Sequence, residues 1–124
     1  MPTNNEKQII GILEKKGFKV ERERVFGHKW VVDLFGERED TNLIIEVKSG
    51  APVSHADIFD LVALRKSYQF RNKNTKCFII NIGRFQLDRN SPIMKVAEAG
   101  DIQILYGEDL SGILSQLNSV IESH

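Results

Sequence analysis

The spacing of apolar residues along the first half of the chain predicts one helix followed by three strands. Thr3-Asn4-Asn5-Glu6 has the spacing of a helix capping box, apolar residues follow at helical intervals, and Gly17 is a natural stop, so we expect a helix over residues 4–16. Apolar and polar residues then alternate with the two-residue period of half-exposed strands. The strands predicted from this alternation cover residues 18–24, 29–36 and 42–48, with a polar loop at 37–41.

The second half of the chain alternates helices with apolar strands. Ser54-His55-Ala56-Asp57 is a second capping-box pattern, and the apolar positions after it predict a long helix that ends near Arg71. Ser91-Pro92 places a cap and a first-turn proline ahead of a short helix that stops at Gly100, and Asp109 caps a final helix with one apolar stripe. Between these helices, two apolar runs predict strands at residues 76–82 and 102–106.

The predicted order of elements is α-β-β-β-α-β-α-β-α, which is typical of an α/β domain with a mixed β-sheet flanked by helices. The helix between the strands at 42–48 and 76–82 makes a crossover connection, so these strands are expected to run parallel, with a right-handed crossover. The chain shows no repeat, linker or low-complexity segment. We therefore expect residues 1–124 to form a single domain.

The composition narrows the class of protein. The chain has a single cysteine, so a disulfide scaffold is excluded, and Cys77 lies in an apolar run where we expect a small core residue in a reducing cytoplasm. No apolar stretch approaches the ~20 residues needed to cross a bilayer, and the first residues lack the character of a signal peptide. The sequence thus predicts a soluble cytoplasmic protein without a membrane partner.

Charge is unevenly distributed, although the net charge is zero. Residues 62–95 carry eight Lys or Arg and one Asp, whereas residues 96–124 carry five acidic residues and no Lys or Arg. The basic segment either forms a local face that holds phosphates or is an ordinary solvated helix and loop. If it binds nucleic acid, the residues expected to contact the backbone are Arg65, Lys66, Arg71, Lys73 and Lys76.

Three charged residues interrupt two strongly apolar strands. Glu46 and Lys48 lie two apart on one predicted strand, so both side chains project from the same face. Asp33 interrupts the apolar run of residues 30–35, and a buried charge requires a partner. A hairpin that closes around residues 36–42 would place Asp33 next to Glu46. The sequence therefore predicts two carboxylates and an ammonium in one place.

This set of side chains suits metal-assisted hydrolysis. Carboxylate oxygens are hard ligands that suit Mg²⁺, which leaves coordination positions open for a substrate phosphate. Lys48 can orient or help to deprotonate an attacking water and can offset negative charge in the transition state. An ordinary salt bridge is the alternative, although it is a costly way to gain stability. The sequence contains no phosphate-binding glycine loop or dinucleotide fingerprint, so we expect no nucleotide cofactor.

Asp33, twelve intervening residues and then Glu46-Val47-Lys48 resemble the Asp…(Asp/Glu)-x-Lys signature of the PD-(D/E)XK, or restriction-endonuclease-like, nuclease superfamily. The predicted elements over about residues 4–82 match that family's α-β-β-β-α-β core, which makes the remaining α-β-α a C-terminal extension. Val32 stands where the family's name expects proline, a departure that many members share. The small size, the glutamate on the first predicted helix and the Glu-Val-Lys-Ser segment are most similar to archaeal Holliday-junction resolvases and related restriction-endonuclease-like proteins.

The resemblance implies an endonuclease that hydrolyses DNA, depends on Mg²⁺ with Mn²⁺ able to substitute, and acts as a homodimer. It implies that Asp33, Glu46 and the Val47 carbonyl bind the metal and that Lys48 assists the attacking water. An acidic residue on the first helix often completes the metal shell in this family, and Glu6 is the matching residue here. Glu6 is equally well explained as the acid of the first capping box.

Polar residues next to the motif have two interpretations each. Ser49 either ends a strand or contacts phosphate. His55 and Asp57 occupy the first turn of a predicted helix, where they either cap it or support phosphate binding. His28 and Trp30 are expected to be structural.

A noncatalytic nucleic-acid-binding or complex-subunit module with the same fold is the alternative function. The three charges on apolar strands argue against it, whereas the neutral total charge and the acidic C-terminal segment argue for it. An RNA nuclease is a third hypothesis.

Overall fold

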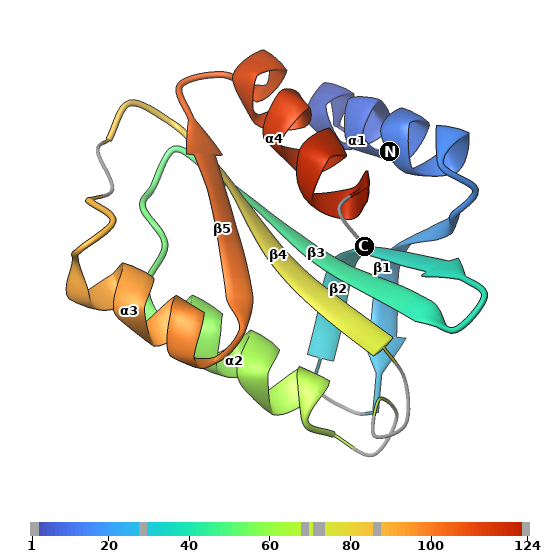
Figure 1. The fold of residues 1–124 in the computed structure, drawn as a ribbon, viewed down its shortest axis with the longest axis horizontal. Coiled ribbons are helices and arrows are strands. Elements are labelled where there is room, and N and C mark those ends of the chain that lie inside the picture. The colour runs from blue at the N-terminus through green and yellow to red at the C-terminus, as the bar shows by residue number, and fades with distance from the viewer. Residues whose placement is uncertain (1–2, 28–29, 68–69, 71–73, 86–87, 123–124) are drawn as a thin grey trace.

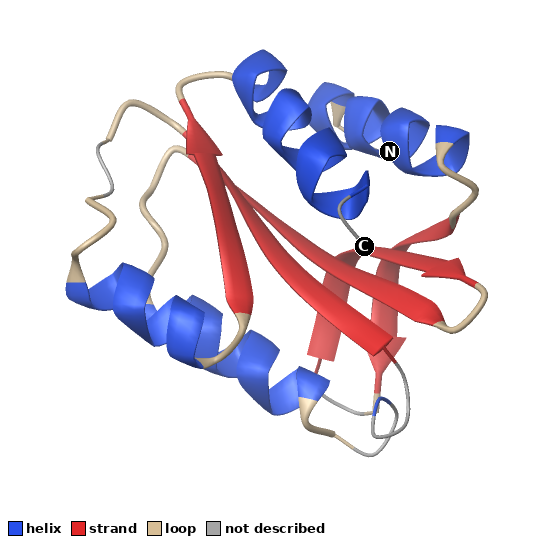
Figure 2. Ribbon diagram, in the orientation of Figure 1, coloured by secondary structure: helices blue, strands red, loops and turns tan. Residues whose placement is uncertain are grey.

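A mixed β-sheet lies between two pairs of helices (Figures 1 and 2). The structure is a computed structural model, and it describes residues 3–27, 30–67, 70, 74–85 and 88–122. The elements in chain order are α1 (Asn4–Lys15), β1 (Lys19–Phe26), β2 (Trp30–Arg38), β3 (Thr41–Ser49), α2 (His55–Arg65), β4 (Asn74–Ile82), α3 (Pro92–Ala99), β5 (Ile102–Gly107) and α4 (Leu110–Glu122). This order and the α/β class are those predicted from the sequence.

The five strands follow one another across the sheet in the order β1-β2-β3-β4-β5. β1 with β2 and β2 with β3 pair antiparallel, as in a meander. β3 with β4 and β4 with β5 pair parallel, which confirms the orientation predicted from the crossover through α2. Among the described residues, no helix is both long and apolar enough to cross a membrane.

Each face of the sheet has its own core. The face under α1 and α4 buries Leu34, Leu43, Ile45, Phe78 and Ile80 together with apolar residues of those helices. The face toward α2 and α3 buries Val32, Phe35, Ile44, Cys77 and Ile79. The alternation in β3 and β4 follows the two-residue period that predicted these strands.

Cys77 is a core residue, as predicted. It lies in the face under α2 and α3 and is 1% exposed. Burial raises the pKa of its thiol to about 12, so the side chain is neutral and unreactive at physiological pH.

The predicted end of α2 and the predicted loop at 37–41 are wrong, each for a local reason, while β1 ends two residues later and β4 begins two residues earlier than predicted. α2 ends at Arg65 and not near Arg71, because the backbone N–H and the hydroxyl of Ser67 both donate to the carbonyl of Leu64 in a tight turn. The expected loop at 37–41 is mostly strand, since the β2–β3 pairing continues to its last pair and leaves a two-residue turn with positive φ at Glu39. Arg71 itself lies outside the described residues.

The β1–β2 hairpin changes face near its middle. Residues two apart on a regular strand share a face, yet Val32 packs under α2 and α3 while Leu34 packs under α1 and α4. Opposite this point, Glu23 has a φ of 50°, a left-handed conformation that breaks the regular pleat of β1. The outer half of the hairpin therefore turns toward α2, and Asp33 lies at the point of change.

Candidate functional site

Asp33 and Glu46 lie side by side, which confirms the juxtaposition predicted from the hairpin. The backbone pairing of β2 with β3 reaches Leu34 and Ile45, and the two acids come next along the strands. The Asp33 carboxylate accepts a hydrogen bond from the backbone N–H of Val47 at 2.8 Å, and the Glu46 carboxylate accepts one from the N–H of Asp33 at 3.4 Å. Each acid thus binds the backbone of the opposite strand where the regular ladder ends.

The surroundings of Glu46 favour a protonated carboxyl in the absence of a cation. Burial, followed by the negative charge of Asp33 and hydrogen bonding with it, raises the pKa of Glu46 to about 8. The charge of Asp57 raises it further. Two carboxylates this close cannot both ionise readily unless a positive charge joins them.

The pair fits a hard divalent cation. Carboxylate oxygens suit Mg²⁺, which commonly uses one or two carboxylates and takes its other ligands from water and substrate. Among the described residues, no group of three or more His, Cys, Asp or Glu side chains is arranged to hold a metal. A cation bound by Asp33 and Glu46 would therefore complete its shell from backbone carbonyls, water or substrate.

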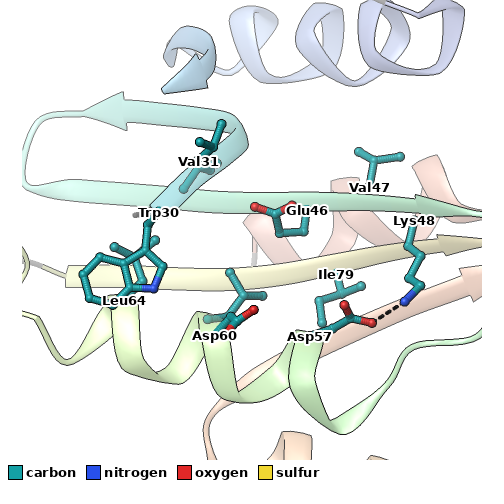
Figure 3. A pocket seen from close by; sticks show the side chains of 11 residues that line it. Trp30, Val31, Glu46, Val47, Lys48, Asp57, Asp60, Leu64 and Ile79 are labelled. Carbon is teal, nitrogen blue, oxygen red and sulfur yellow. Dashed lines mark hydrogen bonds and ion pairs between the residues drawn. The ribbon is translucent and has the colours of Figure 1, made fainter. Parts of the chain in front are cut away.

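Lys48 projects from the same face of β3 as Glu46, as predicted, and its ammonium forms an ion pair with Asp57. Nζ of Lys48 lies 2.5 Å from Oδ2 of Asp57 (Figure 3). The same Oδ2 accepts the backbone N–H of Ser54 at 2.8 Å, and Oγ of Ser54 accepts the N–H of Asp57 at 3.2 Å. Asp57 therefore caps α2, as one interpretation of the sequence held, and also holds Lys48, which no sequence pattern had indicated.

The pKa of Asp57 reflects this pairing. Partial burial would raise it, but the hydrogen bonds from Lys48 and Ser54 outweigh that effect and keep the pKa of Asp57 below its usual range. Asp57 is therefore ionised at physiological pH and holds the Lys48 ammonium by charge as well as by geometry.

Glu46, Lys48 and Asp57 line a cavity of about 310 Å³ between β2, β3 and α2 (Figure 3). Trp30 and Leu64 lie toward one end of the view, and Lys48 and Asp57 toward the other. Trp30, which we expected to be purely structural, is part of the cavity wall. The full lining is Trp30, Val31, Val32, Glu46, Val47, Lys48, Asp57, Asp60, Leu61, Leu64 and Ile79.

Two site residues were not found from the sequence. Asp60 follows Asp57 by three positions on α2 and lines the same cavity, so the helical spacing alone could have linked them. Asn81 is 0% exposed; its side chain donates to the carbonyls of Lys48 at 3.2 Å and Ala51 at 2.8 Å, and accepts the N–H of Val53 at 3.2 Å. A polar residue in an otherwise apolar strand was the available signal for it.

Glu6 was interpreted either as a metal ligand or as the acid of the first capping box, and the structure shows it in the capping box. Its carboxylate accepts the N–H of Thr3 at 2.9 Å, while Oγ1 of Thr3 accepts the N–H of Glu6 at 3.1 Å. The Glu6 carboxylate also lies 3.9 Å from the guanidinium of Arg22. α1 packs on the face of the sheet opposite α2, so the described geometry does not join Glu6 to Asp33 and Glu46 in one metal-binding group.

Two of the residues predicted to contact nucleic acid, Ser49 and His55, lie near the Lys48 end of the site. Ser49 is exposed at the end of β3, and His55 is exposed as the first residue of α2. The ring of His55 lies 6.1 Å from that of Phe59. Both residues are accessible to a bound phosphate backbone.

The predicted basic contacts are not gathered around the cavity. Arg65 donates to Asp101 at 2.9 Å and to the Gly100 carbonyl at 2.7 Å, so it fixes α2 to the turn before β5. Lys66 is exposed at the other end of α2 from His55. Arg71 and Lys73 lie outside the described residues.

Lys76 lies near the start of β4, where it pairs with Leu43, whereas Lys48 pairs with Asn81 further along the same strand. Burial and the nearby charge of Arg38 lower the pKa of Lys76. Five strand positions correspond to roughly 16 Å at ~3.3 Å per residue. Lys76 is therefore distant from Lys48, and it lies three strand positions, or roughly 10 Å, from Ile79, the strand partner of Glu46.

Comparisons with known proteins identify the fold. No protein-family model matches this chain, and no curated protein matches it in sequence. The similar solved structures include a repair endonuclease from Pyrococcus abyssi, which has a TM-score of 0.56 and 17% identity over 84% of this chain and 46% of that one. Pyrococcus furiosus SfsA in complex with Ca²⁺ has a TM-score of 0.55 and 17% identity over 82% of this chain and 55% of that one.

Protein VC1899 from Vibrio cholerae is similar over 95% of this chain and 32% of its own, with a TM-score of 0.69 and 13% identity. This chain thus spans between 32% and 55% of the lengths of these three proteins. At such identities the likeness concerns the fold. The chain shares with these structures its α/β fold, a mixed five-stranded sheet with helices on both faces, as its order of elements predicted.

Proposed function

We propose that this protein is a divalent-metal-dependent nuclease that hydrolyses DNA phosphodiester bonds, with Mg²⁺ as the metal and Mn²⁺ as a substitute. The observation that carries the proposal is the pair Asp33 and Glu46, held to each other's strands beside a cavity that also receives Lys48. The raised pKa of Glu46 supports it, because a carboxyl pair of this kind gains most from a bound cation. The similarity of the fold to that of a repair endonuclease supports it further.

Each residue of the site has a separate role in the proposed hydrolysis. Asp33, Glu46 and the carbonyl of Val47 would hold the cation, which when bound polarises the phosphate and lowers the pKa of a coordinated water. The Lys48 ammonium, fixed by Asp57, orients the attacking water and offsets negative charge that develops on the phosphoryl oxygens. The products would carry 5′-phosphate and 3′-hydroxyl ends.

The finer proposal concerns substrate geometry and assembly. The similarity of Glu46-Val47-Lys48-Ser49 to archaeal resolvases supports a structure-specific enzyme that acts on branched DNA such as a four-way junction. Such an enzyme cuts two strands and is expected to work as a symmetric homodimer. Light scattering during size-exclusion chromatography measures the mass directly, and a monomer that remains monomeric on DNA would contradict the dimer.

A cleavage assay tests the activity. We would incubate a labelled four-way junction, flap, single strand, duplex and RNA with the protein at low salt, with Mg²⁺, Mn²⁺ or EDTA. Cleavage is expected only with metal, and it should disappear in Asp33→Asn and Lys48→Ala. Asp40→Asn in the exposed β2–β3 turn and Lys95→Ala on the exposed side of α3 make the same chemical changes away from the site and should cleave normally.

Cleavage that persists in EDTA or in Asp33→Asn would contradict the proposal. A wild type that binds DNA without cutting any substrate would instead favour the noncatalytic module. Binding by such a module should fall steeply with salt and be indifferent to Asp33→Asn.

A further inference from the structure

The cavity beside the carboxylate pair suits a planar, largely apolar group better than a phosphate. Three of its lining residues are carboxylic acids, Glu46, Asp57 and Asp60. Among the described lining residues Lys48 is the only cation, and its charge is already paired with Asp57. A phosphate that entered beyond Lys48 would meet the Asp60 carboxylate, which has no ion-pair partner among the described residues, so the interior of the cavity is expected to reject it.

The apolar part of the lining is a surface on which a ring can stack. It consists of Trp30, Val31, Val32, Leu61, Leu64 and Ile79. Trp30 lies at one end of the cavity in the close view, with Asp60 between it and Asp57 (Figure 3). Aromatic side chains are the usual stacking partners of unpaired bases, and this kind of stacking is tolerant of base identity.

The size of the cavity limits what enters. Its volume of about 310 Å³ lies at the small end of the ~300–1,000 Å³ range of ligand pockets. A cavity of this size admits one ring system and excludes a paired duplex. The Asp60 carboxylate on its wall is a hydrogen-bond acceptor, so it would bind the amino groups that cytosine, adenine and guanine carry on their edges.

We propose that this cavity is a nucleobase pocket, which receives one unpaired, amino-bearing base from the nucleotide next to the cleaved phosphate. The proposal rests on the proposed nuclease function, because Glu46 belongs both to the carboxylate pair and to the cavity wall. It names the substrate class as DNA with unpaired bases at the cut: a single strand, a flap or the open centre of a branched junction. A base in an intact duplex would first have to leave the stack.

The chain carries its own reporter for this pocket. Trp30 is the only tryptophan, so the intrinsic fluorescence of the full protein reports on the cavity wall. We would titrate metal-free protein with a short oligodeoxycytidine, with oligodeoxythymidine and with a hairpin duplex of equal charge. Oligodeoxycytidine is expected to change the Trp30 emission and to bind at least about tenfold more tightly than the duplex, in line with the stacking energy of one base.

Two pairs of variants separate base binding from general attraction. Val31 lines the cavity and is 57% exposed, while its cross-strand partner Val25 is 59% exposed and does not line the cavity. Val31→Ser should weaken single-strand binding several-fold, whereas Val25→Ser should leave it unchanged. Asp60→Asn should reduce the preference for oligodeoxycytidine over oligodeoxythymidine, whereas Asp40→Asn in the exposed turn should preserve it.

The binding and cleavage results distinguish the two proposals. Equal affinity for single strand and duplex, with no change in Trp30 emission and no difference between Val31→Ser and Val25→Ser, would overturn the base pocket. Metal-dependent cleavage would then still support the nuclease. Selective quenching by single strands without cleavage of any substrate would support the pocket and contradict the nuclease.

Discussion

The first turns of α1 and α2 carry the same capping motif in different surroundings. In α1, Thr3 and Glu6 bind each other's backbone, and Glu6 lies 3.9 Å from Arg22. In α2, Ser54 and Asp57 make the same reciprocal bonds, and Asp57 also lies 2.5 Å from Lys48. The capping geometry is shared, but only the acid of α2 lines the cavity next to the carboxylate pair.

The difference arises from what each helix start packs against. The short segment between β3 and α2 brings the first turn of α2 beside the end of β3, and the three hydrogen bonds of Asn81 hold that segment in place. The first turn of α1 instead lies near Arg22 of β1, on the other face of the sheet. A capping acid is therefore an ordinary local feature, and its second function depends on the strand that happens to end beside it.

The pH dependence of stability should differ most strongly between variants of Glu46, which lies near α2, and of Glu6, which caps α1. The folded pKa of Glu46 is about 8 and the unfolded value is 4.5, so the folded, metal-free protein binds more protons between these values. Its free energy of unfolding should therefore fall as the pH rises from about 4.5 to 8. Chemical denaturation in EDTA measures this. Glu46→Gln should remove the fall, and Glu6→Gln should retain it.

Mg²⁺ competes with the same proton, so it should stabilise the wild type more above about pH 8 than near pH 6. An equal gain at both pH values would show that the ion does not bind at Glu46. Asp57 contributes in the opposite sense, because its pKa is lowered: its stabilisation is present above its unfolded value of 3.8 and is lost as the pH falls through the folded pKa.

The next effect concerns the anchor that keeps α2 beside β3. Asn81→Ala would leave the N–H of Val53 and the carbonyls of Lys48 and Ala51 without their partner, and should lower the free energy of unfolding by about 3 kcal/mol. Asn42→Ala is the matched control, since Asn42 is equally buried but its Nδ2 has no hydrogen-bond partner among the described residues. Urea denaturation should show a clearly smaller loss for Asn42→Ala, and equal losses would contradict the anchoring role.

The rate of DNA cleavage should distinguish the two capping acids, Asp57 and Glu6, although the effect is smaller. Asp57→Asn removes the charge that fixes Lys48 and should reduce turnover by about 10- to 100-fold, the range typical of residues that position a catalytic group. Glu6→Gln should leave turnover within about twofold of wild type. Single-turnover cleavage of the preferred DNA measures both variants, and a similar loss in each would place Glu6 in the active site after all.

Loss of the capping hydroxyl should have the smallest effect, and it should lower the stability equally at α1 and α2. Thr3→Ala and Ser54→Ala each remove a capping oxygen and should each cost about 1 kcal/mol of stability. Turnover should change little in either variant, because Ser54→Ala keeps the backbone N–H that Asp57 accepts. Thermal denaturation paired with cleavage rates checks this, and a large loss of turnover in Ser54→Ala would mean that the Ser54 hydroxyl takes part in the site itself.

The elements predicted from the sequence match the structure where local signals dominate. Both capping boxes and the alternation along β3 and β4 depend on residues a few positions apart, and all are present. The end of α2 was misplaced because the side chain of Ser67 stops the helix inside a pattern that remains helical beyond it. Apolar periodicity shows which face a segment buries, and it does not show where a competing hydrogen bond ends the helix.

The candidate site was predictable in part. Asp33, Glu46 and Lys48 stood out because charges on apolar strands require partners, and a hairpin is short enough for its register to follow from the turn. Other parts of the site join segments that are far apart in the sequence, and the pattern of apolar residues gives no information on how such segments meet. These parts are the ion pair of Lys48 with Asp57, the hydrogen bonds of Asn81, and the cavity wall formed by Trp30 and Asp60.

The sequence is sufficient to predict the order of the elements, the buried faces of β3 and β4 and the presence of a carboxylate pair with a lysine. All of these follow from spacing along the chain and from the cost of burying unpaired charge. The position of Asp57, and not Glu6, at the cavity follows from three-dimensional packing, because both acids have the same local motif. The distinction depends on which strand end packs beside each helix, and that packing is set by long-range burial of apolar surface.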